Sequence, residues 1–494
     1  MSNKKWIGAA LSLALCSTAL VSCSRGSNQS GQTSADQRGG TAIDLNGKAE
    51  KQIREAIAEA SAHGLKPDLF LKGGEDGPAL VDAALKYASA LANGYSDPNK
   101  LFEVYTLPRN KVDVREGLAQ AVQNGDVKGW LASLTPQTDE YRALGQALGR
   151  YLQLASQAKF QPVAEGKPIK PGSRDPRVPQ VEAALRAVGY LEAPQGEQQP
   201  AQAQRAAGTG SQVYSPQLVA TVKQLQGEFG FKQDGIIGGD TLDALNAGPG
   251  YRVRLLAVAM ERLRWLQRNP PGTRIDVNTA SSLLDYWRDG QHVDRRAVVE
   301  GEADKPTPQL QSPIVRLVAK PVWRVPEGIG VKELSTKSAG WLAENGFVQK
   351  DGKWVQQSGP KNSLGLVKFD MDNDQAIYLH DTPAKALFSM PERHRSHGCV
   401  RVQNAMQFAT ALAQEQGILD QFQQAMQKDD ETFVKLKSPI PVRLLYQTAF
   451  WDGARVQFRP DIYGWDENIA KALELAPGPP RKIQQPDSSD DIGP

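Results

Sequence analysis

The chain has 494 residues, too many for one hydrophobic core, so length alone predicts roughly two to four domains. Hydrophobic residues make up 40% of the chain and charged residues 23%, as in ordinary soluble globular proteins. The formal net charge of +3, from 58 basic and 55 acidic residues, gives no support to nucleic-acid binding.

The N-terminal segment has the pattern of an export signal. Two lysines precede an apolar run over residues 6–21. The last two residues of this run begin the sequence Leu20-Val21-Ser22-Cys23. This ending resembles a lipobox, the bacterial motif whose cysteine becomes the lipidated first residue of the mature protein. The resemblance implies a signal peptide over residues 1–22, lipidation at Cys23 and a periplasmic location, and Ser24 favours the outer membrane of a Gram-negative bacterium. An uncleaved N-terminal anchor is the alternative, and both readings export the body of the chain.

The segments that follow have simpler patterns. Residues 23–44 are rich in Ser, Gly and Gln and are predicted to form a flexible tether, and the Pro-rich tail, residues 476–494, is predicted to be disordered. Residues 45–172 carry helical patterns with few chemically special residues. Another helix is expected over residues 252–268, and the whole of residues 251–300 is expected to return to the helical part of the chain.

Residues 173–250 carry a compact helical pattern of their own. Ser215 can cap a helix with Pro216 in its first turn, four apolar residues recur at helical spacing up to Phe229, and Gly230 can end the helix. The segment resembles the three-helix peptidoglycan-binding-like domain. A Gln-rich insert, residues 195–212, interrupts this module, so no glycan-binding residues are assigned within it.

From about residue 313 the pattern becomes strand-like. Apolar and β-branched runs at residues 314–318, 364–369, 377–380 and 442–446 indicate strands. Residues 301–475 are therefore predicted to form a mainly β, sandwich-like domain with short helices. Together with the helical segments, this predicts a multidomain α+β fold.

One cysteine, Cys399, is the candidate catalytic residue of the chain. If Cys16 is removed with the signal and Cys23 is lipidated, Cys399 has no partner for an intramolecular disulfide. Three of the chain's five histidines, His380, His394 and His397, lie within the twenty residues that end at Cys399. A thiol is mostly protonated at neutral pH, and a neighbouring imidazole can accept its proton, so the pattern predicts Cys399 as nucleophile and His380 as base of an acyl transfer.

Two other interpretations of this cluster are open. Cys399 could be a small buried core residue. His394, His397 and Cys399 could also be zinc ligands, but no second cysteine or compact ligand pair lies elsewhere, so no metal is expected. Gly398 favours a tight backbone turn beside the thiol, and a helix is predicted over residues 405–416 with Asn404 as its N-cap.

The sequence of His380, a gap of fifteen residues, and then Ser396-His397-Gly398-Cys399 resembles the active-site signature of the L,D-transpeptidases. Further segments are similar to the large multidomain branch of that family: Pro321–Pro326, Ser358–Gly365, Val367–Phe369, Tyr378–Pro383, Tyr446–Ala449 and Phe458–Tyr463. The resemblance covers roughly residues 45 to 475. Arg401 stands where many smaller members carry Asn, but the large branch commonly has Arg there.

The resemblance implies an organisation and a reaction. The helical residues 45–172 and 251–300 would form a scaffold subdomain, and residues 327–360 would form a mobile capping region, for which a simple surface excursion is the alternative. Cys399 would attack the carbonyl of the third residue of a tetrapeptide stem, release D-Ala and form a thioacyl-enzyme. An amine on a second stem would then take the acyl group, giving a 3-to-3 cross-link.

The resemblance also implies roles for the surrounding residues. Backbone N–H groups of His397, Gly398 and Cys399 would stabilise the oxyanion, and Ser396 would orient His380 through its carbonyl. Arg401, Tyr378 and Asp381 are assigned to substrate binding, and His397 and Arg401 would shape the site rather than act as bases.

No cofactor is expected for this reaction. The expected partners are peptidoglycan stem peptides and glycan strands, the membrane through the N-terminal lipid, and other cell-wall synthases. Inactivation by carbapenems is implied by the resemblance. Hydrolysis by an L,D-carboxypeptidase, transfer to a protein lysine and a non-catalytic peptidoglycan-binding lipoprotein are the alternatives.

Overall fold

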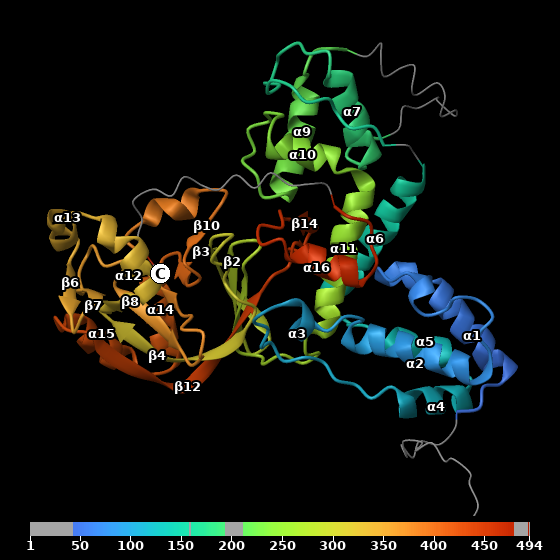
Figure 1. Cartoon of the computed structure of the whole chain (residues 1–494), viewed down its shortest axis with the longest axis horizontal. Helices are drawn as coiled ribbons and strands as arrows, with labels where there is room; N and C mark the ends of the chain where they lie inside the picture. Colours follow the sequence, from blue (N-terminus) through green and yellow to red (C-terminus); the bar gives the residue numbers. More distant parts are fainter. Residues whose placement is uncertain (1–42, 158–159, 193–210, 479–492, 494) are drawn as a thin grey trace, which may run out of the picture. The chain divides into compact units, whose positions relative to one another are not determined.

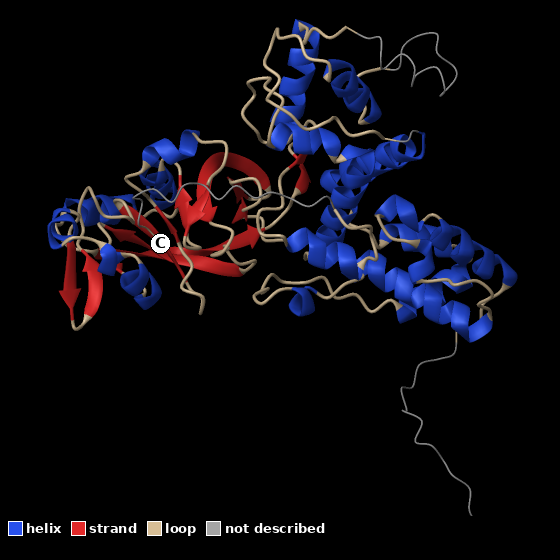
Figure 2. Cartoon of the chain, turned by 45° about the horizontal axis from the view of Figure 1, so that its top comes forward, coloured by secondary structure: helices blue, strands red, loops and turns tan. Residues whose placement is uncertain are grey.

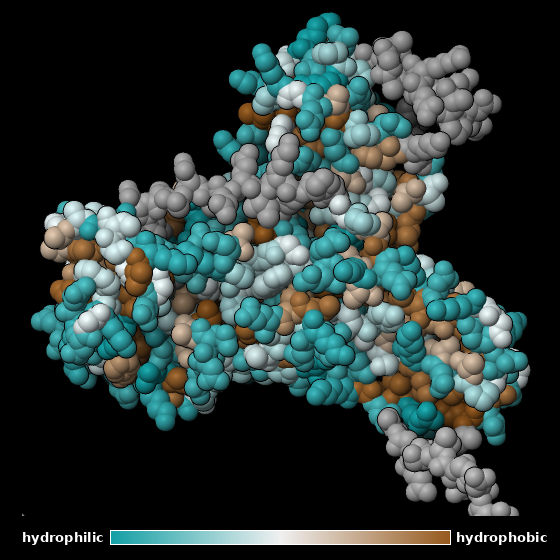
Figure 3. Space-filling view, in the orientation of Figure 1, coloured by the Kyte–Doolittle hydropathy of each residue, from teal (hydrophilic) through white to brown (hydrophobic). Residues whose placement is uncertain are grey.

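The computed structural model describes residues 43–157, 160–192, 211–478 and 493 (Figure 1). The predicted signal peptide, the lipidation site at Cys23, most of the Gln-rich insert and most of the C-terminal tail lie outside the described residues. No helix in the described part of the chain combines the length and apolar character needed to cross a membrane. The face shown in Figure 3 is largely hydrophilic, with apolar residues gathered in separate patches.

The N-terminal part of the described chain is helical (Figure 2). Its helices are α1 (Gly47–Ala58), α2 (Gly77–Asn93), α3 (Pro98–Leu101), α4 (Arg115–Asn124), α5 (Val127–Ser133) and α6 (Asp139–Gln157), with short 3₁₀ turns at Ala60–His63 and Pro67–Leu69. Asn46 caps α1 by accepting a hydrogen bond from the Ala49 N–H at 2.9 Å, and Asp126 caps α5 in the same way. The apolar faces of α1, α2, α4 and α5 bury a shared core that includes Ile53, Leu80 and Leu118.

Helix α11 (Gly248–Trp265) is buried along almost its whole length. It packs against α6, α2 and α16 (Trp465–Ala472). Its buried charges are paired: Arg264 with Glu261 and Arg262 with Asp466, each at 2.6 Å. Because an unpaired buried charge is costly, these pairs allow a charged helix to occupy the interior.

A small helical module follows the first six helices along the chain. It contains α7 (Val178–Ala187), α9 (Pro216–Glu228) and α10 (Asp240–Asn246). The predicted cap is confirmed, since Ser215 Oγ accepts a hydrogen bond from the Leu218 N–H at 3.3 Å and Pro216 begins α9. Gly230 has a positive φ of 72° just after the helix ends.

A nine-stranded mixed sheet forms the core of the C-terminal part. In the order of pairing its strands are β10 (His394–Ser396), β3 (Gln291–Gly301), β11 (Val400–Val402), β9 (Leu379–His380), β8 (Val367–Met371), β4 (Gln311–Ala319), β12 (Thr432–Leu445), β1 (Arg274–Asn278) and β2 (Leu283–Arg288). Strand β2 also pairs with β3, so the sheet closes on itself. Helices α14 (Ala405–Glu415) and α15 (Leu419–Gln427) pack onto it and share its apolar core. The predicted α+β class is confirmed.

The expectation of a helical return over residues 251–300 is wrong beyond Trp265. Strands β1, β2 and β3 occupy residues 274–301 and belong to the main sheet. In β1 the buried Ile275 and Val277 flank the half-buried Asp276, and in β2 the buried Leu284 and Tyr286 alternate with half-buried neighbours. This period of two is the pattern of a strand, so the sheet domain begins before the predicted residue 301.

Residues 323–356 form a small substructure beside the main sheet. It contains the three-stranded sheet β5 (Trp323–Arg324), β7 (Lys353–Gln356) and β6 (Phe347–Lys350), with α12 (Glu327–Lys332), a 3₁₀ turn at Leu334–Thr336 and α13 (Ala339–Glu344). Trp323, Leu334 and Phe347 are central to a separate apolar core. The predicted capping region is thus a folded unit, while its motion stays a prediction. A two-stranded sheet, β13 (Ala449–Trp451) and β14 (Val456–Phe458), completes the fold.

Candidate active site

Two adjacent strands bring the predicted nucleophile and base together. Strand β11 pairs in parallel with β9, so that Val400 lies opposite Leu379 and Arg401 opposite His380. The Val400 N–H donates to the Tyr378 carbonyl at 3.1 Å, which places Cys399 alongside Tyr378 at the start of the pairing. His380 and Cys399, nineteen positions apart in sequence, therefore lie on or directly beside two paired central strands, where the main chain holds them rigidly.

The turn before Cys399 is fixed by two hydroxyl groups. Ser396 Oγ accepts a hydrogen bond from the Gly398 N–H at 3.1 Å and donates to the Cys399 carbonyl at 2.5 Å. Thr307 Oγ1 donates to the Gly398 carbonyl at 2.8 Å. Gly398 has a φ of +113°, a conformation that side chains rarely adopt, so glycine is required there. Sequence reasoning missed Thr307, which lies outside the signature.

The His380 imidazole is buried and is oriented by its neighbour. Its Nδ1 donates to the Asp381 carbonyl, while Nε2 has no hydrogen-bond partner among the residues that the structure describes. With the proton on Nδ1, Nε2 is the basic atom. The prediction that the Ser396 carbonyl orients His380 is wrong, because Nδ1 bonds to Asp381 instead and the Ser396 carbonyl accepts the Glu302 N–H at 2.9 Å.

Burial acts on the thiol and the imidazole in opposite directions. It raises the pKa of Cys399 to about 11, against weaker opposing effects from Tyr378. It holds the pKa of His380 well below the usual 6.5, and the Arg401 charge lowers that pKa further. Both shifts favour the uncharged form. The resting pair is therefore a neutral thiol and a neutral imidazole, and the thiol donates at 3.7 Å to the Ala376 carbonyl.

The three residues assigned to substrate binding lie close to this pair, and each has a different environment. Tyr378 stacks edge-on against His380, with ring centroids 5.7 Å apart. Arg401 is fully buried next to His380 on the paired strand. The Asp381 carboxylate already accepts the Leu366 N–H at 3.0 Å and pairs with Lys385. Its visible role is to hold the loop before β8, and substrate binding by Asp381 stays a prediction.

The other two histidines of the cluster point to different partners. His397 Nδ1 bonds to the Gly493 carbonyl at 2.6 Å and its Nε2 to the carboxylate of Glu333, which belongs to the capping region. His394 bonds to the Thr279 carbonyl at 2.8 Å and lies 3.2 Å from the buried carboxylate of Glu300. Within the described ranges, no three His, Cys, Asp or Glu side chains are grouped to hold a metal ion.

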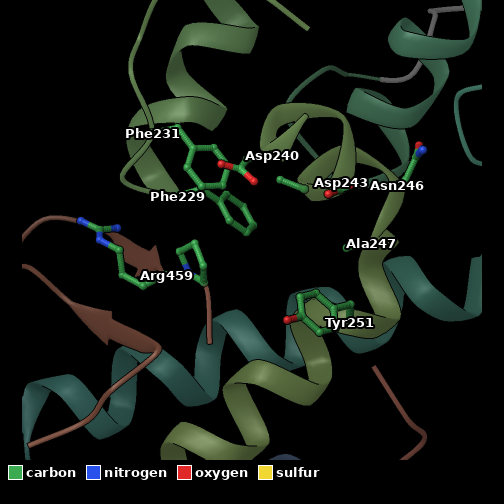
Figure 4. A pocket seen from close by; sticks show the side chains of 10 residues that line it. Phe229, Phe231, Asp240, Asp243, Asn246, Ala247, Tyr251 and Arg459 are labelled. Carbon is green, nitrogen blue, oxygen red and sulfur yellow. The ribbon is translucent and has the colours of Figure 1, made fainter. Parts of the chain in front are cut away.

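A separate pocket lies between the helical module, the start of α11 and residues 459–460, and is lined by none of the predicted catalytic residues. Its volume is about 120 Å³. Figure 4 shows the rings of Phe229 and Phe231 near Asp240, with Tyr251 and Arg459 also on its walls. Arg459 donates to the Glu228 carbonyl at 3.0 Å, which ties the end of α9 to the residues after β14.

Comparison with known families and proteins agrees with this geometry. Residues 272–425 match the family described as "L,D-transpeptidase catalytic domain", residues 78–148 match a "Scaffold domain", and residues 174–245 match a "Putative peptidoglycan binding domain". A Haemophilus influenzae protein named "Putative L,D-transpeptidase" is 31% identical over 238 residues, which are 43% of this chain and 48% of that protein. The chain thus spans about half the length of this curated relative.

Two solved structures show weak overall likeness. A mutant of an Enterococcus faecium L,D-transpeptidase is 13% identical, with a TM-score of 0.20, over 35% of this chain and 50% of that one. An L,D-transpeptidase from Mycobacterium smegmatis is 14% identical, with a TM-score of 0.21, over 35% of this chain and 58% of that one.

Proposed function

We propose that this chain, which carries an L,D-transpeptidase catalytic domain over residues 272–425 and a peptidoglycan-binding domain over residues 174–245, forms 3-to-3 peptidoglycan cross-links through a thioacyl intermediate on Cys399. The observation that carries the proposal is the parallel pairing of β9 with β11. This pairing sets the buried thiol beside the strand that carries the buried imidazole, whose Nε2 has no partner in the described part of the chain.

The proposed first half-reaction uses one base and one nucleophile. Cys399 Sγ attacks the carbonyl carbon of the third stem residue as His380 Nε2 takes the thiol proton. An S–C bond forms, and the carbonyl π electrons move to the oxygen. When the tetrahedral intermediate collapses, the C–N bond to D-Ala breaks and His380 returns the proton to the departing amine.

The second half-reaction restores the enzyme. His380 Nε2 takes a proton from the acceptor amine, which attacks the thioester. The C–S bond then breaks to give the amide, and His380 returns the proton to the departing sulfur, which restores the free thiol and the neutral imidazole. Because the resting pair is uncharged, each proton moves during attack rather than before it. The thiol must turn from the Ala376 carbonyl toward His380 when substrate arrives.

Among the three backbone N–H groups predicted to stabilise the oxyanion, those of Gly398 and Cys399 differ in whether they already donate a hydrogen bond. The Gly398 N–H is already bonded to Ser396 Oγ, so it is a poor candidate. The Cys399 N–H donates to no atom among the described residues. We therefore assign oxyanion stabilisation first to Cys399 itself.

Product analysis tests the proposed reaction. The full chain and its Cys399→Ala variant would be incubated with disaccharide-tetrapeptides and analysed by mass spectrometry. Dimers lacking one D-Ala, formed by the wild type alone, support transpeptidation. Tripeptide monomers without dimers would move the assignment to a carboxypeptidase. Binding to peptidoglycan sacculi without any Cys399-dependent product would favour the non-catalytic lipoprotein.

We also propose a periplasmic location, with the chain held to the outer membrane by lipid on Cys23. The support is the sequence alone: the two lysines and the apolar run of residues 6–21, the lipobox-like Leu20–Cys23, and Ser24 after it. Cells expressing the full chain would be labelled with a fatty-acid analogue. Cys23→Ala should lose the label and the membrane fraction, whereas Cys16→Ala should keep both. Label retained by Cys23→Ala would contradict this proposal.

A further inference from the structure

Thr307 lies in the loop between β3 and β4 and is fully buried. Its Oγ1 accepts a hydrogen bond from the Gly301 N–H at 2.9 Å and donates to the Gly398 carbonyl at 2.8 Å. A hydroxyl has one proton; the Gly301 N–H donates to Oγ1, and the Gly398 carbonyl can only accept. The proton of Thr307 is therefore committed to Gly398.

This bond fixes the direction of the next amide. The C=O and N–H of a trans peptide point in opposite directions from one rigid plane. Since the Gly398 C=O points toward Thr307, the Cys399 N–H of the same peptide points away from it. The Cys399 carbonyl is held separately by Ser396 Oγ.

The loop that carries Thr307 is itself rigidly held. Tyr463 OH donates to the Gly301 carbonyl at 2.8 Å and accepts the Thr307 N–H at 3.3 Å. A Cβ at Gly301 would lie 2.2 Å from the Lys305 carbonyl, so only glycine fits there. Thr307 is thus a fixed support rather than an adaptable surface hydroxyl.

We infer that Thr307 is a positioning residue: by holding the Gly398 carbonyl, it aims the Cys399 N–H at the oxyanion of the tetrahedral intermediate. The inference rests on the proposed function. Glycine at position 398 has wide backbone freedom, so the Gly398–Cys399 peptide would reorient if the Thr307 bond were lost. An N–H that is already oriented toward the oxyanion needs no reorganisation during the reaction, so it stabilises the transition state more strongly than a mobile N–H would.

Two reactions of the same thiol separate this role from a general structural one. Acylation by a disaccharide-tetrapeptide passes through an oxyanion, whereas alkylation by iodoacetamide displaces iodide at a saturated carbon and does not. Thr307→Val removes the hydroxyl and keeps the shape, and Thr307→Ser keeps the hydroxyl. Thr410→Val is the matched control, because Thr410 makes an equivalent 2.8 Å bond to the Met406 carbonyl within α14.

In the full chain, Thr307→Val should lower the rate of thioacyl-enzyme formation by roughly 10- to 100-fold, somewhat less than complete loss of an oxyanion donor. Its alkylation rate should stay within about twofold of wild type, and Thr307→Ser and Thr410→Val should acylate almost normally. If Thr307→Val does not fold, as judged by thermal unfolding, Thr307→Ala replaces it in the same comparison with Thr307→Ser.

Normal acylation by the hydroxyl-free variants would overturn the inference. So would an equal fall in acylation and alkylation, since that would mean a displaced thiol. A wild type that alkylates but never acylates would instead overturn the proposed function, and with it the inference that rests on it.

Discussion

Cys399 and His380 lie in an environment that favours uncharged groups. Burial raises the pKa of the thiol to about 11 and lowers that of the imidazole well below its usual value. A preformed thiolate–imidazolium pair would require the opposite shifts. The sequence signature identifies both residues but carries no information about their charge, which depends on how deeply the fold buries them.

The pH dependence of thiol alkylation tests this charge state. A raised pKa means more protonated thiol at neutral pH, so iodoacetamide should react slowly at pH 7 and increasingly fast toward a midpoint near pH 11. Acylation should persist below pH 6.5, because the lowered pKa of His380 keeps its imidazole unprotonated there and able to accept the thiol proton. An alkylation rate that is already on a plateau at pH 7 would reveal an ion pair and contradict this interpretation.

At the scale of elements, the predicted capping region is linked to the turn before Cys399. Glu333, between α12 and the following 3₁₀ turn, bonds to His397, and Lys305 lies 3.4 Å from the same carboxylate. Lys305 also pairs with Glu302, whose N–H holds the Ser396 carbonyl. The predicted capping region and the turn before Cys399 therefore share one charged contact, and closure of that region is predicted to exclude water.

Glu333→Gln should weaken this contact while keeping its shape. We expect faster amide hydrogen exchange in residues 327–345 and a larger share of hydrolysed tripeptide relative to cross-linked dimer, because the cap opens more often. Glu344→Gln is the control, since Glu344 lies in the same region but pairs with the exposed Lys361. Identical exchange in the Glu333 variant and the wild type would show that the contact does not hold the cap.

Sequence patterns predicted elements well where the signal is local. The Ser215 cap and the 405–416 helix, observed as 405–415, depend on nearby residues. Asn404 does precede that helix, but it has a left-handed φ of 50° and its side chain caps nothing. Strands β1 to β3 were missed because their short alternations follow a long helix. Thr307 and Glu333 could not be found, since only the tertiary fold brings them to the turn.

At the scale of the whole molecule, buried charges on α11 join segments far apart in sequence. Glu261 accepts bonds from the Ser96 N–H at 2.7 Å and from the Trp265 indole at 3.2 Å, besides pairing with Arg264. Arg262 pairs with Asp466 of α16. The sequence shows α11 as a helix, but its charges look like surface residues until the fold supplies their partners.

Glu261→Gln tests this arrangement, because it leaves the buried Arg264 uncompensated. It should lower the free energy of unfolding by about 3–5 kcal/mol in urea titration. Glu59→Gln, which breaks an exposed pair with Lys128, should cost less than about 1 kcal/mol. Equal small losses in both variants would mean that the α11 pairs add little to the fold.

Direct identification of the acyl-enzyme tests the central claim most closely. The full chain would be mixed with disaccharide-tetrapeptide, quenched in acid and analysed as intact protein and as peptides by mass spectrometry. We predict an adduct of the substrate minus D-Ala, located on Cys399 and absent from Cys399→Ala. Cross-linked product formed by Cys399→Ala, or an adduct on any other residue, would contradict the account.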